Sequence, residues 1–376
     1  MTHAQTIQMR RRTGRRYAIM VFLVLALIGG WTWFWIYGAG RAQEMIDGWR
    51  AREAASGRDY TCGSQSVGGF PFRFELDCGE VTVLLRGGTP LEIKAGRVLA
   101  VTQVYDPTLL ISEFTGPLSV EAPGGAPFVV ANWKLAQSSV RGTPRAPERA
   151  SLIFDQPVID RVDGAGRQVL LRAARLELHG RIVEGTVTND PVIETVLRVS
   201  QASVPPLHPA AAPPADGEIR VTLRGLKDFA PMSWPGRLRT LQAADGRIEI
   251  GEFRGKQGDT LAVGSGTLSL NAQGRLQGEL RVTIAGLESF LRAIGAEQMV
   301  QRSTNMDKLT GTLNRIAPGL GDVARKQASA NVAAGIAMLG EHATLEGRQA
   351  VTLPLRVDNG AVFLGPIPVG VTPALF

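Results

Sequence analysis

One apolar run dominates the N-terminal part of the chain. It extends over residues 17–37, begins and ends with tyrosine, and contains no charged residue. A helix rises about 1.5 Å per residue, so a run of this length can cross a hydrocarbon core of roughly 30 Å. Three tryptophans, Trp31, Trp33 and Trp35, gather near its C-terminal end with Tyr37, where amphipathic aromatic side chains settle at headgroup depth. The pattern predicts a transmembrane helix over 17–37.

The residues before this run set its orientation. Residues 1–16 hold five arginines and no acidic residue. By the positive-inside rule, we expect 1–16 to be a basic cytoplasmic tail and the rest of the chain to lie across the membrane. A cleaved signal peptide is the alternative, but its apolar region is usually shorter, about 7–15 residues. Gly38-Ala39-Gly40 is a weak cleavage motif, so we favour an uncleaved anchor.

Beyond the anchor, alternation with a period of two replaces the long apolar pattern. Residues 38–58 are partly amphipathic and predict a stalk helix. From residue 59, short alternating segments are separated by Gly and Pro at hairpin spacing, which predicts a β-rich domain over 59–376. The predicted strands in its first part are Phe72–Cys78, Val81–Leu85, Leu91–Val101, Leu109–Phe114, Leu118–Val120, Phe128–Leu135, Ser151–Phe154, Val169–Leu178, Ile193–Val199 and Gly217–Leu223.

The clearest strand signal lies over Arg239–Ile284. Asp245-Gly246 and Gly258-Asp259 mark turns between its alternating segments. This predicts an antiparallel meander with one apolar face, to which Leu280 and Val282 contribute. A Pro/Ala-rich loop at 204–216 is the best candidate for an internal boundary.

The C-terminal part mixes helices and strands. A helical section is expected at about 287–340, with candidates at Leu287–Ile294, Met306–Ile316 and Ala324–Leu339. Strands are expected at Val351–Val357 and Ala361–Leu364, followed by a segment too rich in proline for a central strand. Val221–Phe229 also echoes Val282–Phe290, since each is a strand followed by Gly-Leu; this suggests duplicated sheet units.

Charge changes the picture less than the total suggests. The chain has a net charge of +7, but five of its 41 basic residues lie in the tail, and the other 36 nearly balance 34 acidic residues. The basic character therefore belongs to the topology signal, and we exclude nucleic-acid binding.

Cys62 and Cys78 are the two cysteines of the sequence. Both lie on the predicted exported side, where disulfides persist. No histidine is near them and their spacing is not C-x-x-C, which argues against a metal or redox site. We predict a structural disulfide between Cys62 and Cys78.

Catalytic motifs are missing from the sequence. It contains no H-E-x-x-H, no P-loop, no G-x-S-x-G and no dinucleotide fingerprint. His179, His208 and His342 stand in separate contexts, and the acidic residues are dispersed. We expect no catalytic residues, no metal and no cofactor, and hence no enzyme. A hydrolase whose site is scattered along the chain is the third and weakest hypothesis.

Two motifs suggest a family. Gly69-Phe70-Pro71-Phe72-Arg73-Phe74, between Cys62 and Cys78, follows the Arg-flanked anchor, and the chain nearly closes with the segment Leu353–Pro366. This order resembles the bacterial family called domain of unknown function 2125, seen as predicted periplasmic proteins. The meander is also similar in pattern to AsmA-like envelope proteins, a resemblance that implies a role in lipid movement.

Together these observations predict a mainly β, α+β fold. It is a long, curved antiparallel meander with a C-terminal helical section, preceded by one transmembrane helix. We expect a single-pass protein of the bacterial inner membrane, with a cytoplasmic N-terminus and a periplasmic domain. The preferred function is non-enzymatic: binding or handling a phospholipid or glycolipid in an apolar β groove, with ligand-binding residues unknown. The alternative is a scaffold that binds other envelope proteins.

Overall fold

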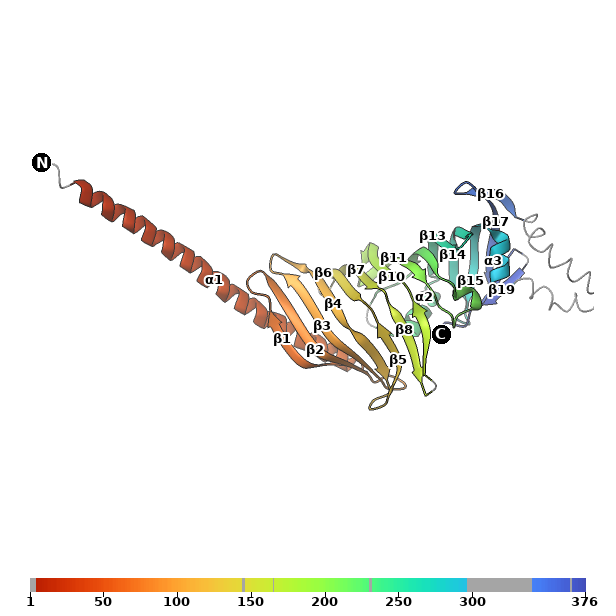
Figure 1. Ribbon diagram of the computed structural model, residues 1–376, viewed down its shortest axis with the longest axis horizontal. Coiled ribbons are helices and arrows are strands. Elements are labelled where there is room, and N and C mark those ends of the chain that lie inside the picture. Colours follow the sequence, from red (N-terminus) through yellow and green to blue (C-terminus); the bar gives the residue numbers. More distant parts are fainter. Residues whose placement is uncertain (1–4, 144–145, 165, 230–231, 296–339, 366) are drawn as a thin grey trace, which may run out of the picture. The chain divides into compact units, whose positions relative to one another are not determined.

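The computed structural model describes residues 5–143, 146–164, 166–229, 232–295, 340–365 and 367–376. The chain divides into two compact units, 1–126 and 127–376. Both contain antiparallel strands, which make up most of the second unit, and there are three α-helices among the described residues (Figure 1). The predicted fold class is therefore confirmed: the sheet is antiparallel and open, and an apolar helix precedes it.

The first unit is a long helix followed by a four-stranded meander. Its elements are α1 (Gln5–Ala55), β1 (Arg58–Gly68), β2 (Arg73–Leu85), β3 (Leu91–Gln103) and β4 (Asp106–Glu121), and each strand pairs with the next. The predicted anchor and stalk form one continuous helix. Among the described residues, α1 is the one helix long and apolar enough to span a membrane.

One stripe of α1 packs on this meander. Trp49 lies against Tyr60, with ring centroids 4.7 Å apart. Gly38 comes so close to Phe74 that an added Cβ would approach the ring to 2.6 Å. The weak cleavage motif at Gly38 is therefore a point of close helix–sheet packing.

The second unit contains most of the strands. Its elements are β5 (Pro127–Asn132), β6 (Leu135–Thr143), β7 (Ala146–Asp155), β8 (Val158–Asp163), β9 (Gly166–Arg172), β10 (Arg175–Thr186), β11 (Asn189–Ala202), η1 (Pro209–Ala211), β12 (Ala215–Arg224), α2 (Trp234–Ala243), β13 (Arg247–Gln257), β14 (Thr260–Leu270), β15 (Leu276–Ala285), α3 (Leu287–Ala293), β16 (Glu341–Leu345), β17 (Arg348–Asp358), β18 (Ala361–Leu364) and β19 (Ile367–Val371).

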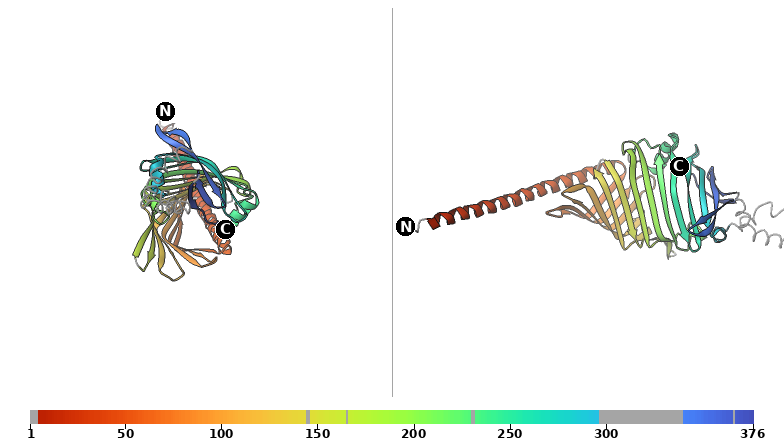
Figure 2. Two further views of the ribbon diagram at one scale, coloured as in Figure 1. Left: turned by 90° about the vertical axis from the view of Figure 1, so that its right-hand side faces the viewer. Right: turned by 90° about the horizontal axis from the view of Figure 1, so that it is seen from above.

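Pairing in this unit follows chain order with few exceptions. β6 pairs with β7, β7 with β10, and β10 through β15 pair in sequence; β15 then pairs with β17, and β18 and β19 follow (Figure 2). β16 forms a hairpin with β17, while β5, β8 and β9 pair among themselves. The predicted boundary at 204–216 lies inside this unit, between β11 and β12.

The sequence echo has a structural counterpart. β12 ends at Arg224 and β15 at Ala285, and each is followed by a glycine of positive φ, Gly225 at 93° and Gly286 at 75°. The next residue is buried in both cases, Leu226 at 3% exposure and Leu287 at 8%. A left-handed glycine turns the chain back over the sheet at both places, because other residues rarely adopt that conformation.

Four strand predictions were wrong in their boundaries. The segments Leu109–Phe114 and Leu118–Val120 belong to the single strand β4, because Gly116-Pro117 forms a bulge opposite Gly96 and the pairing resumes beyond it. Conversely, Val169–Leu178 is divided between β9 and β10, and Phe128–Leu135 between β5 and β6.

The start of the predicted meander was also wrong. Residues from Trp234 to Ala243 form α2, where Ser233 caps the helix by accepting from the backbone N–H of Gly236. β13, β14 and β15 confirm the rest of the meander, and α3 confirms the first predicted helix. The predicted helices Met306–Ile316 and Ala324–Leu339 lie outside the described residues. β16 was not predicted.

Candidate functional site

In the second unit, one face of the sheet carries a row that crosses eight strands and has an apolar side chain at each position except Gly264. The register places in one row Leu152, Leu178, Leu197, Ile219, Phe253, Gly264, Val282 and Leu353. Because side chains alternate between faces, the next row faces the other way. It consists of Ile153, Glu177, Arg198, Glu218, Arg254, Val263, Thr283 and Thr352. We call these the apolar face and the polar face.

Helical cover divides the apolar face into two regions. Over β13, β14, β15 and β17, the apolar side chains of α3 join the main core cluster, and Val282 and Leu353 are 3% and 1% exposed (Figure 1). Over β7, β10 and β11, by contrast, Leu178 is 39% exposed, and Leu152 and Leu197 are partly exposed. We call the first the covered region and the second the open region. Leu280 and Val282, which were predicted to lie on the apolar face of the meander, lie in the covered region.

A pocket of about 310 Å³ opens beside the covered region. Its lining is mainly apolar and consists of His208, Ala210, Ala211, Gln257, Thr260, Phe290, Ala293 and Ile294. Gln257 fixes one wall, because its side-chain amide donates to the carbonyls of Ala210 and Pro213 at 3.0 and 2.8 Å. The volume is at the lower end of the range for small-molecule sites. No serine or carboxylate is among the lining residues.

The first unit has an apolar face of its own. Its register aligns Tyr60 on β1 with Val83, Ile93 and Val120 on the following strands. α1 packs on the β1 side, and the apolar side chains of this face on β3 and β4 are partly or fully exposed. On the opposite face, Arg97 forms a bidentate pair with Asp77, with Nε–Oδ1 at 2.6 Å, which lowers the pKa of that carboxyl.

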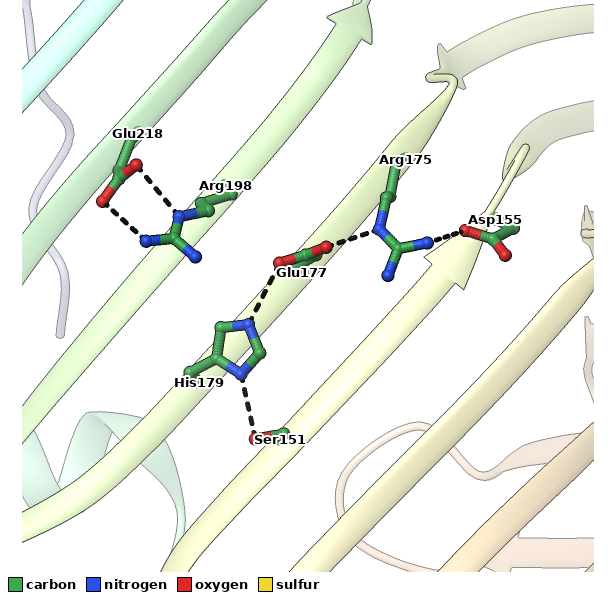
Figure 3. Close-up of polar contacts among 7 residues, drawn as sticks. All are labelled: Ser151, Asp155, Arg175, Glu177, His179, Arg198 and Glu218. Atoms are coloured by element: carbon green, nitrogen blue, oxygen red, sulfur yellow. Dashed lines mark hydrogen bonds and ion pairs between the residues drawn. The ribbon is translucent and has the colours of Figure 1, made fainter.

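The polar face of the second unit carries a network of paired side chains (Figure 3). The ring nitrogens of His179 contact Ser151 Oγ at 2.9 Å and Glu177 Oε2 at 3.2 Å. Arg175 donates from Nε to Glu177 and from Nη1 to Asp155 Oδ1, the latter at 2.6 Å. The hydrogen bond from Arg175, and then that from His179, lower the pKa of the Glu177 carboxyl.

A second pair lies beside this network. Arg198 on β11 donates to Glu218 on β12 through both Nε and Nη2, at 2.9 and 3.2 Å. The hydrogen bond from Arg198 lowers the pKa of the Glu218 carboxyl. Charged partners thus stand opposite one another on neighbouring strands, which stabilises sheet pairing.

His179 contacts a serine, Ser151, on one side and a carboxylate, Glu177, on the other. This chain of contacts resembles that of a catalytic triad. Its surroundings do not suit acyl transfer, however. β7 and β10 each pair on both sides, so their backbone N–H groups are committed to the ladder and cannot form an oxyanion hole. None of the three residues lines the pocket described above. We interpret the network as a cross-strand ladder.

The cysteines lie together in the first unit. Cys62 on β1 and Cys78 on β2 form a disulfide with their Cα atoms 5.5 Å apart. Arg50 of α1 donates to the Cys62 sulfur at 3.1 Å, so the bridge lies where the helix meets the sheet. Among the described residues, no group of three or more His, Cys, Asp or Glu side chains could hold a metal ion. His208 caps η1, and His342 lies on β16.

Sequence reasoning missed the polar ladder and the open region. The ladder could have been predicted, because Arg175, Glu177 and His179 occur at every second position of one strand. The open region was not, since Leu178 and Val282 occupy equivalent places in the alternation and differ in what covers them.

Comparison with known proteins places the chain in a family. It matches no curated protein and no solved structure. One family model matches residues 35–373, and its description is "Uncharacterized protein conserved in bacteria (DUF2125)". The match covers most of both units and begins at Trp35, within α1. This chain therefore belongs to the bacterial family DUF2125.

Proposed function

We propose that this chain is a membrane-anchored protein of the bacterial envelope that binds lipid on the open region of its apolar face and catalyses no reaction. The observation that carries the proposal is the contrast in cover along that face. The row from Leu152 to Leu353 is apolar throughout, yet Leu178 is 39% exposed and Leu353 only 1%. A contiguous exposed apolar surface on a protein marks a binding site.

An acyl chain suits such a surface. It is unbranched and apolar, needs no hydrogen-bond partner, and gains about 0.8 kcal/mol for each CH₂ group removed from water. The charged side chains of the neighbouring strands point to the polar face, so they do not interrupt the apolar row. A phospholipid or a glycolipid supplies such a chain. Lipid handling is also what the similarity in pattern to AsmA-like proteins implies, and it stays a prediction.

The proposal includes an orientation in the inner membrane. The arginine-rich tail lies in the cytoplasm, α1 crosses the bilayer, and the strands of both units lie in the periplasm. The Cys62–Cys78 disulfide supports this orientation, since such bonds persist in an oxidising compartment.

The test uses the full-length chain in living bacteria. The photoreactive residue p-benzoylphenylalanine replaces Leu178 on the apolar face or Arg181, which lies on the opposite face of the same strand and is also exposed. After irradiation, mass spectrometry identifies the adducts. We expect lipid adducts at position 178 and none at 181. Protein adducts at 178 in place of lipid would contradict lipid binding.

A matched pair of variants strengthens the test. Leu197 and Val196 are neighbours on β11, are both partly exposed, and face opposite sides. Leu197→Glu puts a charge on the open region and should abolish the lipid adduct at 178, whereas Val196→Glu should leave it.

A scaffold that binds envelope proteins is the second candidate. It is favoured by the edge strand β19, which among the described strands pairs only with β18, and by Val371 on it, which is 73% exposed. Such an edge can pair with a strand from another protein. Adducts of a single protein species at 178 or 371, with no lipid at 178, would favour the scaffold.

A further inference from the structure

The first unit carries exposed aromatic side chains at one end of its sheet. Phe70 and Phe72, in the turn between β1 and β2, are 53% and 63% exposed, and Tyr105, in the turn between β3 and β4, is 75% exposed. The two turns are joined, because the backbone N–H of Val104 donates to the carbonyl of Phe72 at 2.9 Å. We call Phe70, Pro71, Phe72 and Tyr105 the aromatic end.

The aromatic end is fixed to the apolar part of α1. Trp31 donates from Nε1 to the carbonyl of Pro71, and Trp35 donates from Nε1 to the carbonyl of Arg73, both at 2.9 Å. Trp35 also packs edge-on against Phe70, with ring centroids 5.6 Å apart. These contacts hold both turns of the aromatic end at the level of residues 31–35 of the helix.

That level lies within the apolar run rather than beyond it. Trp31 precedes Tyr37, the last residue of the run, by six positions, which corresponds to roughly 9 Å along a helix. If α1 crosses the bilayer with this run, the aromatic end reaches the boundary between headgroups and acyl chains. Membrane-surface helices bury their apolar side to a similar depth of about 5–10 Å.

Polar groups at this end are arranged for such an environment. Backbone groups away from water need internal partners. The carbonyls of Pro71 and Arg73 accept from the tryptophans, that of Phe72 accepts from Val104, and that of Gly69 accepts from the backbone N–H of Arg73 at 3.1 Å. The Arg73 side chain is exposed and paired with Glu75, and a long basic side chain of this kind can reach the headgroups.

The opposite end of the same sheet has a different character. The turn between β2 and β3 is Arg86-Gly87-Gly88-Thr89-Pro90, and the segment after β4 is Ala122-Pro123-Gly124-Gly125-Ala126. Neither contains an aromatic residue. The sheet is thus polarised along its strands, with its aromatic turns at the end that contacts Trp31 and Trp35 of α1.

We propose that the aromatic end is a second membrane contact, which dips into the lipid interface beside α1 and holds the first unit against the bilayer. This inference rests on the membrane anchor in the proposed function. It is independent of whether the second unit binds lipid.

The test places p-benzoylphenylalanine in the full-length chain in bacterial membranes, at position 72 or at position 89. Both residues are exposed and lie in turns at opposite ends of one sheet, so they form a matched pair. Position 25, in the middle of the apolar run, serves as the reference for the anchor. We expect lipid adducts at positions 25 and 72 and no lipid adducts at position 89.

The outcomes distinguish the second membrane contact from the membrane anchor. Lipid adducts at 25 without any at 72 would leave the anchor intact and overturn the second contact. Protein adducts at 72 would overturn it in favour of a docking site for another protein. If no lipid adducts form at position 25 or at position 72, the assignment of α1 as a membrane anchor is wrong. Both this inference and the proposed function would then be wrong as well.

Discussion

The covered and open regions of the second unit have the same alternation and different surroundings. Val282 and Leu178 belong to one row of the apolar face, yet they differ in exposure by more than tenfold, 3% against 39%. The difference comes from the segments that follow the strands. β15 is followed directly by Gly286 and α3, which turn back over the sheet, whereas β10 ends in a hairpin that continues into β11. Helical cover therefore determines which part of the face becomes core.

The largest expected effect comes from a charge in each region. Val282→Glu buries an unpaired carboxylate and should cost about 3–5 kcal/mol, or abolish folding of the covered region. Leu197→Glu meets solvent and should cost about 1 kcal/mol. Native-state hydrogen exchange of the full-length chain in detergent measures both, as the free energy of opening at β15 and β11. Equal costs would mean that the two regions are buried alike.

The next largest effect is expected from truncating a side chain of α3, the helix that packs on the covered region. Leu291 of α3 is 2% exposed within the core cluster. Leu291→Ala should lower the free energy of unfolding by about 2–5 kcal/mol, from lost burial and the cavity left behind. Leu207→Ala is the control, since Leu207 is 76% exposed and should cost little. A similar loss for both variants would show that α3 contributes nothing specific.

Two glycines differ in how much room their surroundings leave for a side chain. A Cβ at Gly264 would meet the Phe253 ring at 2.5 Å and the carbonyl of Arg281 at 2.6 Å, so Gly264→Ala should cost about 1–3 kcal/mol. A Cβ at Gly255 would meet nothing within 4 Å, and Gly255→Ala should be neutral or stabilise by up to about 1 kcal/mol. Denaturant midpoints of the two variants give the comparison; a loss at Gly255 would contradict it.

The smallest effect concerns the polar face behind each region. The pKa of Glu177 is lowered in the folded state, so its carboxylate stabilises the fold above its ordinary value of 4.5, and this contribution is lost as the pH falls below that value. Glu177 and its partner Arg175 are partly exposed, so the loss of folding free energy should stay below about 1 kcal/mol. Behind the covered region, Thr283 and Thr352 share an uncharged hydrogen bond of 2.8 Å.

Hydrogen exchange at several pH values, corrected for intrinsic rates, tests this last difference. Protection of β10 should fall in acid, and Glu177→Gln should remove part of the fall. Protection at Thr283 should change less. An unchanged acid response of β10 in the Glu177→Gln variant would exclude the ladder as its source.

Much of this fold could be predicted from the sequence because its pairing is local. Alternation around Val282 and the turn at Gly258-Asp259 were enough to identify β13, β14 and β15. The sequence did not reveal α2, because its signal, a Ser233 cap before Trp234-Pro235, is short and was outweighed by the strands nearby. It also did not reveal that Trp31 and Pro71 meet, since that contact joins a helix to a turn forty residues away.

The order of strand pairing also affects how the chain can fold during synthesis. From β11 to β15, each strand pairs with the one made just before it. A chain that emerges N-terminus first can therefore extend its sheet one strand at a time, and low sequence separation favours fast pairing. The growing edge stays open until the next strand arrives, which makes it a site where a neighbouring chain could pair wrongly. Slow synthesis would therefore prolong the exposure of an unpaired strand edge, so misassembly is a greater risk to this sheet than slow folding.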